Sequence, residues 1–170
     1  MSTYLAALDL LADAPTRLAQ LTSPEAGPVL DAEILGLQLA GADLTSYAYE
    51  PAAMAAAAAA QTLIERAIGR AESALDAAAR DRYALPLAPL DDLVTGILHD
   101  LAWFYCYRSG VPDDVAKKAE QARADLGRIQ RGELHLTAAA IGSGTGVGMA
   151  DWSAPADTFP AADLDAFGGA

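Results

Sequence analysis

The chain has 170 residues, a single cysteine and a formal net charge of −12 at pH 7. This length fits one domain with a buried core plus a tail, and a single cysteine excludes an internal disulfide. The acidic balance argues against a protein that reads nucleic acid, because such a protein needs a basic face to neutralise phosphates.

The negative charge is unevenly distributed along the chain. Residues 1–60 carry −6, residues 61–137 carry −2, and residues 138–170 carry −4 with no base among them. Solubility is the simplest explanation of such a surface, but an acid-lined channel would also repel a phosphate backbone and let it slide. We therefore expect that the protein does not bind DNA, although DNA can pass close to it.

No targeting or membrane segment is predicted. The N-terminus lacks a positively charged leader, and Asp9 and Asp13 interrupt its apolar residues. The apolar run 54–60 is far shorter than the roughly 20 residues that a membrane span needs. We expect a soluble cytoplasmic protein with no membrane partner.

The first third of the chain is predicted to hold short helices. An amphipathic helix covers residues 4–11 and is broken around Pro15, and Thr16 can cap a further turn. After a Pro- and Gly-rich stretch, residues 30–40 are predicted to be helical because four residues share one face: Leu30, Ile34, Leu37 and Gly41.

Residues 52–80 should form the longest helix, because alanine dominates them and has the highest helix propensity. A narrow stripe of small residues along it lets a neighbouring helix approach closely; its members are Leu63, Ala67, Ala71, Ala74 and Ala78. The helix must end at a rigid elbow, residues 82–87, because Pro86 and Pro89 fix their own backbone angle and cannot donate a hydrogen bond.

A second apolar helix is predicted over residues 90–107, with one broad hydrophobic face that suits the core. Trp103 and Tyr107 lie off this face, four residues apart, and need a second surface to cover them. That surface is either the N-terminal segment of the same chain or a neighbouring subunit. Cys106 is interpreted as a small buried hydrophobe, because only Arg108 is close enough in sequence to activate a thiol.

The third long helix, Asp113 to Arg131, has the best-defined ends. Two aspartates begin it, Arg128 and Arg131 end it, and Gly132 suits a left-handed closing residue, while Pro112 suits the first helical position. Its mixed-charge face is solvated in the simplest interpretation. In a ring of identical subunits it could instead pair with the acidic N-terminal region of the next copy.

The chain changes character after Thr137, so we predict two parts: a helical domain over residues 1–137 and a Gly-rich tail over residues 138–170. The alternating glycines are no phosphate loop, because no lysine follows them and no strand precedes them. The tail is either disordered or docks on a partner through spaced anchors, which are Trp152, Phe159, Leu164 and Phe167.

No catalytic, cofactor or metal site is predicted. His99 and His135 are the two histidines, and although Asp92 and Asp100 lie near His99, a structural histidine is the favoured interpretation. The sequence has no nucleophile elbow, and no Cys and His pairing is visible. Enzymatic function is therefore not expected.

Four features together resemble one family. They are the helix leading into Arg82-Tyr83-x-Leu85-Pro86-Leu87, the aromatic helix, the third helix, and its close in Gly132-Glu133-Leu134. The run 71–136 resembles the adaptor (head-tail connector) family of Mu-like phages and prophages. Residues 4–11, Leu18-Ala19-Gln20-Leu21-Thr22 and the terminal stretch 159–167 are similar to the opening and the terminal hydrophobic clip of that family.

The resemblance implies a structural virion protein in the neck of a phage. Its expected fold is a small all-α bundle of about four to five helices with an extended C-terminal tail. It would form a homo-oligomeric ring between the portal protein and a tail-side neck or tail terminator protein, with DNA only passing through the lumen. The expected contact residues are Tyr83, Leu85, Pro86, Trp103, Tyr107, Trp152, Phe159, Leu164 and Phe167.

Two other classes stay open. An acidic helical regulator or inhibitor would bind a basic partner, but its carboxylates should be clustered, whereas here they are scattered along the sequence. A helical bundle that binds a small ligand is the third possibility. Light scattering with and without the tail separates a ring former from a monomeric inhibitor.

Overall fold

The computed structural model describes residues 4–24, 28–138 and 140, and within them the fold is all-α, as predicted. The described residues form six α-helices instead of the expected four to five, because the turn after Pro15 is a complete helix. They are α1 (Ala7–Asp13), α2 (Pro15–Thr22), α3 (Ala32–Leu39), α4 (Pro51–Ala79), α5 (Asp92–Cys106) and α6 (Asp113–Arg131), with a 3-10 turn, η1 (Leu44–Ser46).

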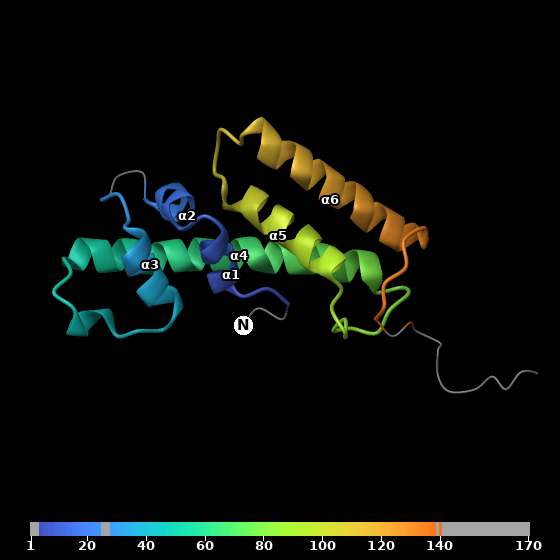
Figure 1. Ribbon diagram of the computed structural model, residues 1–170, viewed down its shortest axis with the longest axis horizontal. Coiled ribbons are helices and arrows are strands. Elements are labelled where there is room, and N and C mark those ends of the chain that lie inside the picture. Colours follow the sequence, from blue (N-terminus) through green and yellow to red (C-terminus); the bar gives the residue numbers. More distant parts are fainter. Residues whose placement is uncertain (1–3, 25–27, 139, 141–170) are drawn as a thin grey trace, which may run out of the picture.

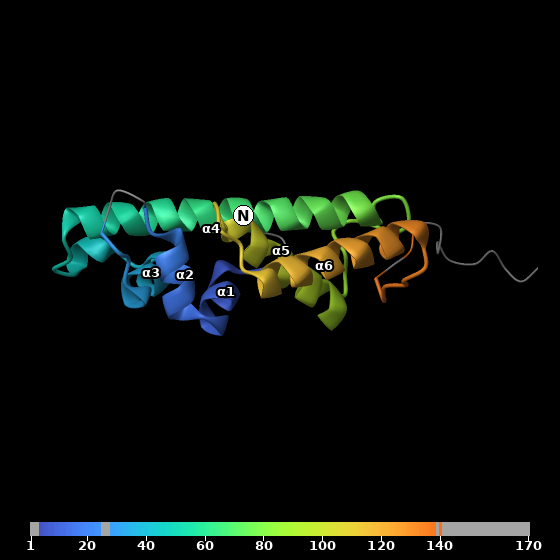
Figure 2. The same ribbon diagram turned by 90° about the horizontal axis from the view of Figure 1, so that it is seen from above.

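Helix α4 is the central helix, and the other α-helices of the described residues pack against it. Its 29 residues extend for about 43 Å at the usual rise per residue. Helices α1, α2 and α3 pack along its N-terminal half, and α5 and α6 along its C-terminal half (Figure 1). Seen from above, all five lie on the same side of α4 (Figure 2). No described helix covers the opposite face of α4. The exposed residues of α4 are Pro51, Ala52, Ala55, Ala58, Ala59, Thr62, Glu65, Arg66, Arg70, Ser73 and Ala77.

The core forms where α4, α5 and α6 meet. Alanines on α4 allow close approach, and larger side chains such as Ile64, Ile68 and Leu75 fill the space beside them. Helix α5 contributes Leu98 and Leu101, both fully buried. The predicted stripe of α4 is therefore the packed face, with three of its five members buried: Ala67, Ala71 and Ala78.

The N-terminal half corrects two expectations. Thr16 does not cap α2, because Pro15 is already its first residue and Ala14 is the capping position. In α3 the fully buried residue is Leu35, which lies outside the predicted face. The apolar residues of this short helix are nearly continuous, so the sequence leaves its rotation undetermined, and packing decides it. Leu11 of α1 packs against Gly36, where a Cβ atom would lie 3.3 Å from the Leu11 methyl group.

The two long C-terminal helices end close to where the sequence places them. Helix α6 has the predicted bounds, and Gly132 closes it with a φ of 75° in the left-handed region. Pro112 is the capping residue instead of the first helical residue. Asp91 precedes α5 and holds the chain after α6, because its carboxylate accepts hydrogen bonds from the backbone N–H and the hydroxyl of Thr137. These bonds lower the pKa of Asp91.

Candidate interaction surfaces

Tyr83 in the elbow between α4 and α5 is buried within the chain, with 4% of its surface exposed. Its hydroxyl accepts a hydrogen bond from the backbone N–H of Leu136 at 2.9 Å, and its backbone forms a bridge with Ala140. The tyrosine of the predicted motif therefore fastens the segment after α6 to the elbow. Little of its own surface is left for a partner.

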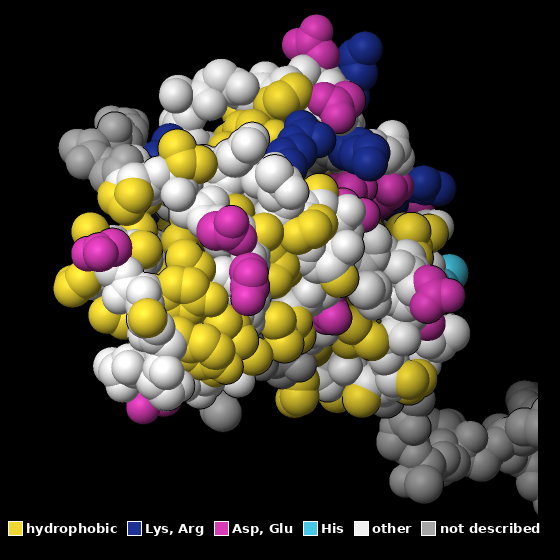
Figure 3. Space-filling view, turned by 60° about the vertical axis from the view of Figure 1, so that its left-hand side comes forward, with side chains coloured by type: hydrophobic (Ala, Val, Ile, Leu, Met, Phe, Trp, Pro, Cys, Tyr) yellow, Lys and Arg dark blue, Asp and Glu magenta, His cyan; other side chains and the backbone are white. Residues whose placement is uncertain are grey.

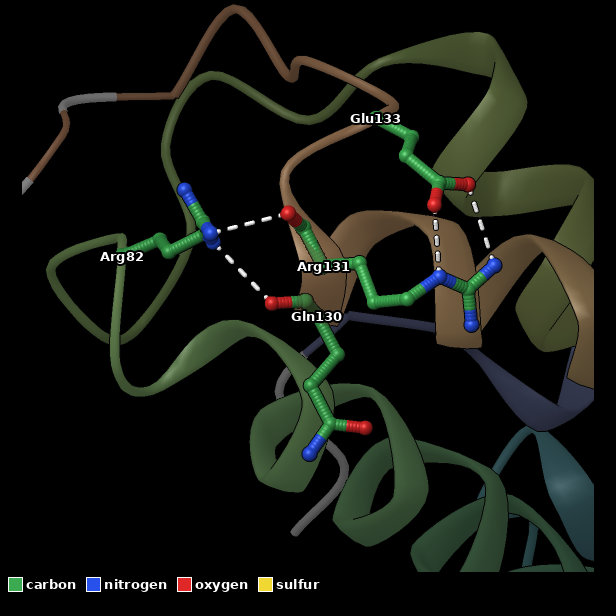
Figure 4. Close-up of polar contacts among 4 residues, drawn as sticks. All are labelled: Arg82, Gln130, Arg131 and Glu133. Carbon is green, nitrogen blue, oxygen red and sulfur yellow. Dashed lines mark hydrogen bonds and ion pairs between the residues drawn. The ribbon is translucent and has the colours of Figure 1, made fainter.

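Arg82 joins the elbow to the end of α6 (Figure 4). Its guanidinium donates to the backbone carbonyls of Gln130 at 3.0 Å and Arg131 at 2.9 Å. These carbonyls belong to the last turn of α6, which has no intrahelical donors for them, and a cation there also complements the helix dipole. The Arg131 side chain points elsewhere and forms a two-bond ion pair with Glu133, which lowers the pKa of that carboxyl.

Tyr4 is a third fastening of the elbow, and sequence reasoning missed it. Its hydroxyl donates to the carboxylate of Asp76 at 2.9 Å and accepts from the backbone N–H of Leu87 at 3.0 Å. Its backbone N–H donates to Glu72, a buried carboxylate on α4. Burial raises the pKa of the Tyr4 hydroxyl. No local pattern could have predicted this role, because the partners lie 68 to 83 positions away.

Leu85 and Pro86, the outer part of the elbow, face solvent. Leu85 is 42% exposed, and Pro86 is exposed as well. The motif therefore divides into two sets of side chains. Arg82 and Tyr83 hold the fold together, whereas Leu85 and Pro86 form a small apolar surface that a partner can contact.

Trp103 is covered by α2 of the same chain, whereas Tyr107 beside it is only half-buried. Trp103 is 7% exposed. The Arg17 guanidinium lies 5.7 Å from its ring centroid and 5.9 Å from that of Tyr107. Arg17 Nε also donates to the Tyr107 hydroxyl at 3.0 Å. This cluster connects the N-terminal helices to α5 by cation–π contacts and a hydrogen bond.

His99 lies beside this cluster and is hydrogen-bonded within the chain. Its Nε2 accepts a hydrogen bond from Trp103 Nε1 at 3.2 Å, and carboxylate oxygens of Asp13 and Asp100 lie 3.8 Å from its two ring nitrogens. Within residues 4–24, 28–138 and 140, no group of three or more His, Cys, Asp or Glu side chains is arranged to hold a metal ion.

Cys106, the last residue of α5, is fully buried. Burial raises the pKa of its thiol to about 12, so the side chain is a neutral thiol in ordinary buffers. The interpretation as a buried small hydrophobe is confirmed.

A cationic hollow runs between the middle of α4 and the C-terminal end of α5, and we name it the arginine groove. Its volume is 380 Å³, and its main walls are Leu63, Arg66, Arg70, Tyr105, Tyr107 and Arg108. A shallower hollow beside it shares Arg66, Arg70 and Tyr105. Sequence reasoning did not find this site, because Arg108 is brought to the other two arginines only by the packing of α5 on α4.

The end of the molecule formed by α3, η1 and the start of α4 is apolar. Hydrophobic side chains gather there at the lower left of Figure 3. Val29 is 76% exposed, and Tyr47, which stacks on Tyr49 with 5.6 Å between ring centroids, is also exposed. The four predicted tail anchors Trp152, Phe159, Leu164 and Phe167 lie outside the described residues.

The sequence of the chain matches a known family over most of its length. The model of the family described as Bacteriophage Mu, Gp36 matches residues 4–146. The chain belongs to this family. It is therefore a Mu-like phage protein with a structural or morphogenetic role. No curated protein gives a significant match. Among the helices of the described residues, none has the length and apolar character to cross a membrane.

Proposed function

We propose that this Mu Gp36 family member is a head-tail connector that forms a ring in the neck of the phage particle. In this proposal the ring lies between the portal protein and a tail-side neck or tail terminator protein, and DNA passes through its lumen. The role is mechanical: rigid helices set the shape of the ring, and the C-terminal segment attaches it through Phe159, Leu164 and Phe167.

The one-sided packing of α4 carries the proposal. A helix of 29 residues with helices on one side only presents a long, mostly small-residue face to the outside. In a phage structural protein, such a face is suited to a neighbouring subunit, because alanines allow a second helix to approach closely. A contact between unlike faces of identical copies closes into a ring when the rotation between copies is right.

The overall negative charge supports the same role. The chain carries a net charge of −12, so a ring of its copies would repel the phosphate backbone and would not hold DNA in place. Such a lumen lets DNA slide.

Electron microscopy of the phage particle tests the location. We expect a label fused to the chain to appear at the neck, between head and tail, and purified portal protein of the same phage to bind the full-length chain. A label found on the tail tip or in the head interior would contradict the proposal.

Light scattering tests the competing acidic inhibitor. A connector should change its assembly state on meeting the portal, whereas an inhibitor of a basic partner should stay monomeric and bind that partner one to one.

Ala58→Arg places a long charged side chain on the open face of α4 and should block ring formation without unfolding the chain, because residue 58 is exposed. A variant with the same substitution at exposed Ala48, away from α4, is the control.

A further inference from the structure

The three arginines of the arginine groove have no side-chain hydrogen bond or ion pair within the described part of the chain. No hydrogen bond or ion pair of the described residues involves the side chain of Arg66, Arg70 or Arg108. The carboxylate of the nearby Glu65 is engaged elsewhere, because it accepts from the Gln61 amide at 2.8 Å. Other arginines are used by the fold, as Arg17 and Arg82 show. The groove is therefore a cluster of arginines without ion pairs among the described residues, on a protein of net charge −12.

The groove also offers apolar and aromatic surface. Leu63 lies in its wall on α4, and the half-buried rings of Tyr105 and Tyr107 lie opposite on the end of α5. A ligand that fits must combine negative charge with aromatic or aliphatic side chains. This combination favours an acidic peptide over a nucleic acid, because the rest of the chain repels a long phosphate backbone.

The C-terminal segment has this chemistry. Residues 138–170 contain four aspartates and no base. Each hydrophobic anchor lies within two positions of an aspartate: Asp151 precedes Trp152, Asp157 precedes Phe159, and Asp163 and Asp165 flank Leu164 and precede Phe167. An anchor that enters the groove therefore brings a carboxylate to the arginines.

A long stretch of chain separates the described residues from the first anchor. The described chain ends at Ala140, beside Tyr83 at the C-terminal end of α4. The 11 residues from there to Asp151 span up to about 36 Å when extended. Every copy carries both a groove and a matching segment, and a contact between two such unlike parts of identical copies can repeat head-to-tail around a ring.

We infer that the arginine groove is the receptor for residues 151–167 of a second copy of this chain. The inference rests on the proposed function and deepens it, because it names the surface that the C-terminal segment grips. Salt bridges to Arg66, Arg70 and Arg108 hold the aspartates, and the two tyrosines and Leu63 receive the anchors. The contact weakens as salt is added, since its charges are exposed.

Photo-crosslinking in the full-length chain tests the contact. The photoreactive amino acid p-benzoylphenylalanine replaces Thr62, an exposed residue at the rim of the groove, and equal amounts of ¹⁴N- and ¹⁵N-labelled copies are mixed and irradiated. We expect crosslinks to peptides within residues 151–167, with about half of them joining the two isotopes, as random pairing of copies requires. The same probe at Tyr47, an exposed residue that follows η1 and does not line the groove, should give no such crosslink.

Charge reversal makes the test specific. The double variant R66E/R70E should lower the crosslink yield about tenfold, and D157R/D163R combined with it should restore the yield. Both arginines are exposed, so circular dichroism and the melting temperature should stay close to those of the wild type. The inference would be overturned if crosslinks formed only within one copy or only to other peptides. It would also be overturned if D157R/D163R did not restore the crosslink yield of R66E/R70E.

Three further outcomes separate the alternatives. Competition of the crosslink by short duplex DNA, with loss of DNA binding in R66E/R70E, would overturn the peptide receptor in favour of a nucleic acid site. Absence of the crosslink in a protein that still labels the phage neck would refute the receptor and leave the connector role intact. A crosslink found in a protein that is absent from the phage neck would support the receptor and refute the connector role.

Discussion

The hydroxyl of Tyr83 and the backbone N–H of Leu136 form a buried hydrogen bond of 2.9 Å between residues 53 positions apart. Through it the elbow after α4 holds the segment that follows α6. Removal of the hydroxyl would leave the Leu136 N–H buried without an acceptor, which costs more than the bond itself contributes.

Tyr83→Phe should therefore lower the free energy of unfolding by about 1–3 kcal/mol. Urea denaturation followed by circular dichroism measures it. The matched control is Tyr47→Phe, since Tyr47 is exposed and makes no hydrogen bond through its hydroxyl to another described residue. Equal midpoints for the two variants would show that the Tyr83 hydroxyl does not hold the segment.

Gly132→Ala should destabilise the protein more than Gly41→Ala does. Both glycines have a positive φ, 75° and 74°, so each substitution carries a backbone cost of about 1–2 kcal/mol. Only at Gly132 would the new methyl group also collide with a guanidinium, that of Arg82, whereas nothing lies within 4 Å at Gly41. Thermal unfolding of the two variants gives the difference. If R82A removed none of the excess cost at Gly132, the collision would not be its cause.

Gly96→Ala should stabilise α5 by about 0.5–1 kcal/mol, because alanine loses less backbone entropy in a helix and a Cβ atom there meets nothing within 4 Å. Gly36→Ala in α3 is the contrast, since its methyl group would press on Leu11. Chemical denaturation should rank Gly96→Ala above the wild type and above Gly36→Ala. A loss of stability at residue 96 would indicate an occupant of that surface.

The thiol of Cys106 should react with iodoacetamide at pH 8 only when the chain unfolds. Its pKa is raised from 9.0 to about 12 by burial, so the folded chain offers almost no thiolate. Mass spectrometry of the labelled protein over time measures the rate, and urea should increase it. An added thiol at exposed residue 109, in Ser109→Cys, should label rapidly in the same sample.

The same thiol gives stability a dependence on pH. Because its folded pKa lies above the unfolded value, the protonated thiol contributes fully below about pH 9 and the contribution is lost between about pH 9 and 12. Cys106→Ala should flatten the stability curve in this alkaline range. An unchanged slope in that variant would show that other groups, such as tyrosines, cause the alkaline loss.

Local signals predicted the elements whose ends carry strong capping and breaking residues. Helix α6 has the predicted bounds because aspartates, arginines and Gly132 all indicate the same ends. Helix α4 follows from its alanine content, and the elbow follows from Pro86 and Pro89. These are properties of neighbouring residues, which a sequence displays directly.

Contacts between distant residues were not predictable in the same way. The partners of Tyr4 lie on α4 and in the elbow, and no local pattern marks them. The rotation of α3 was wrong because its short apolar run permits several buried faces. The arginine groove needs α5 to run back along α4, which brings Arg108 to Arg66. Tyr83 was expected to meet a partner, although its hydroxyl is used inside the chain.

The two ends of the described chain meet at the elbow, and this has a consequence for synthesis. Leu87 is fastened by Tyr4, 83 positions earlier, and Leu136 by Tyr83, 53 positions earlier. During translation the first helices emerge long before the residues that fasten them, and the last fastening waits until Leu136 has left the ribosome. A message cut short within α6 would therefore yield a chain whose elbow is held by Tyr4 alone, and we expect that chain to be more exposed to proteolysis before it could enter a particle.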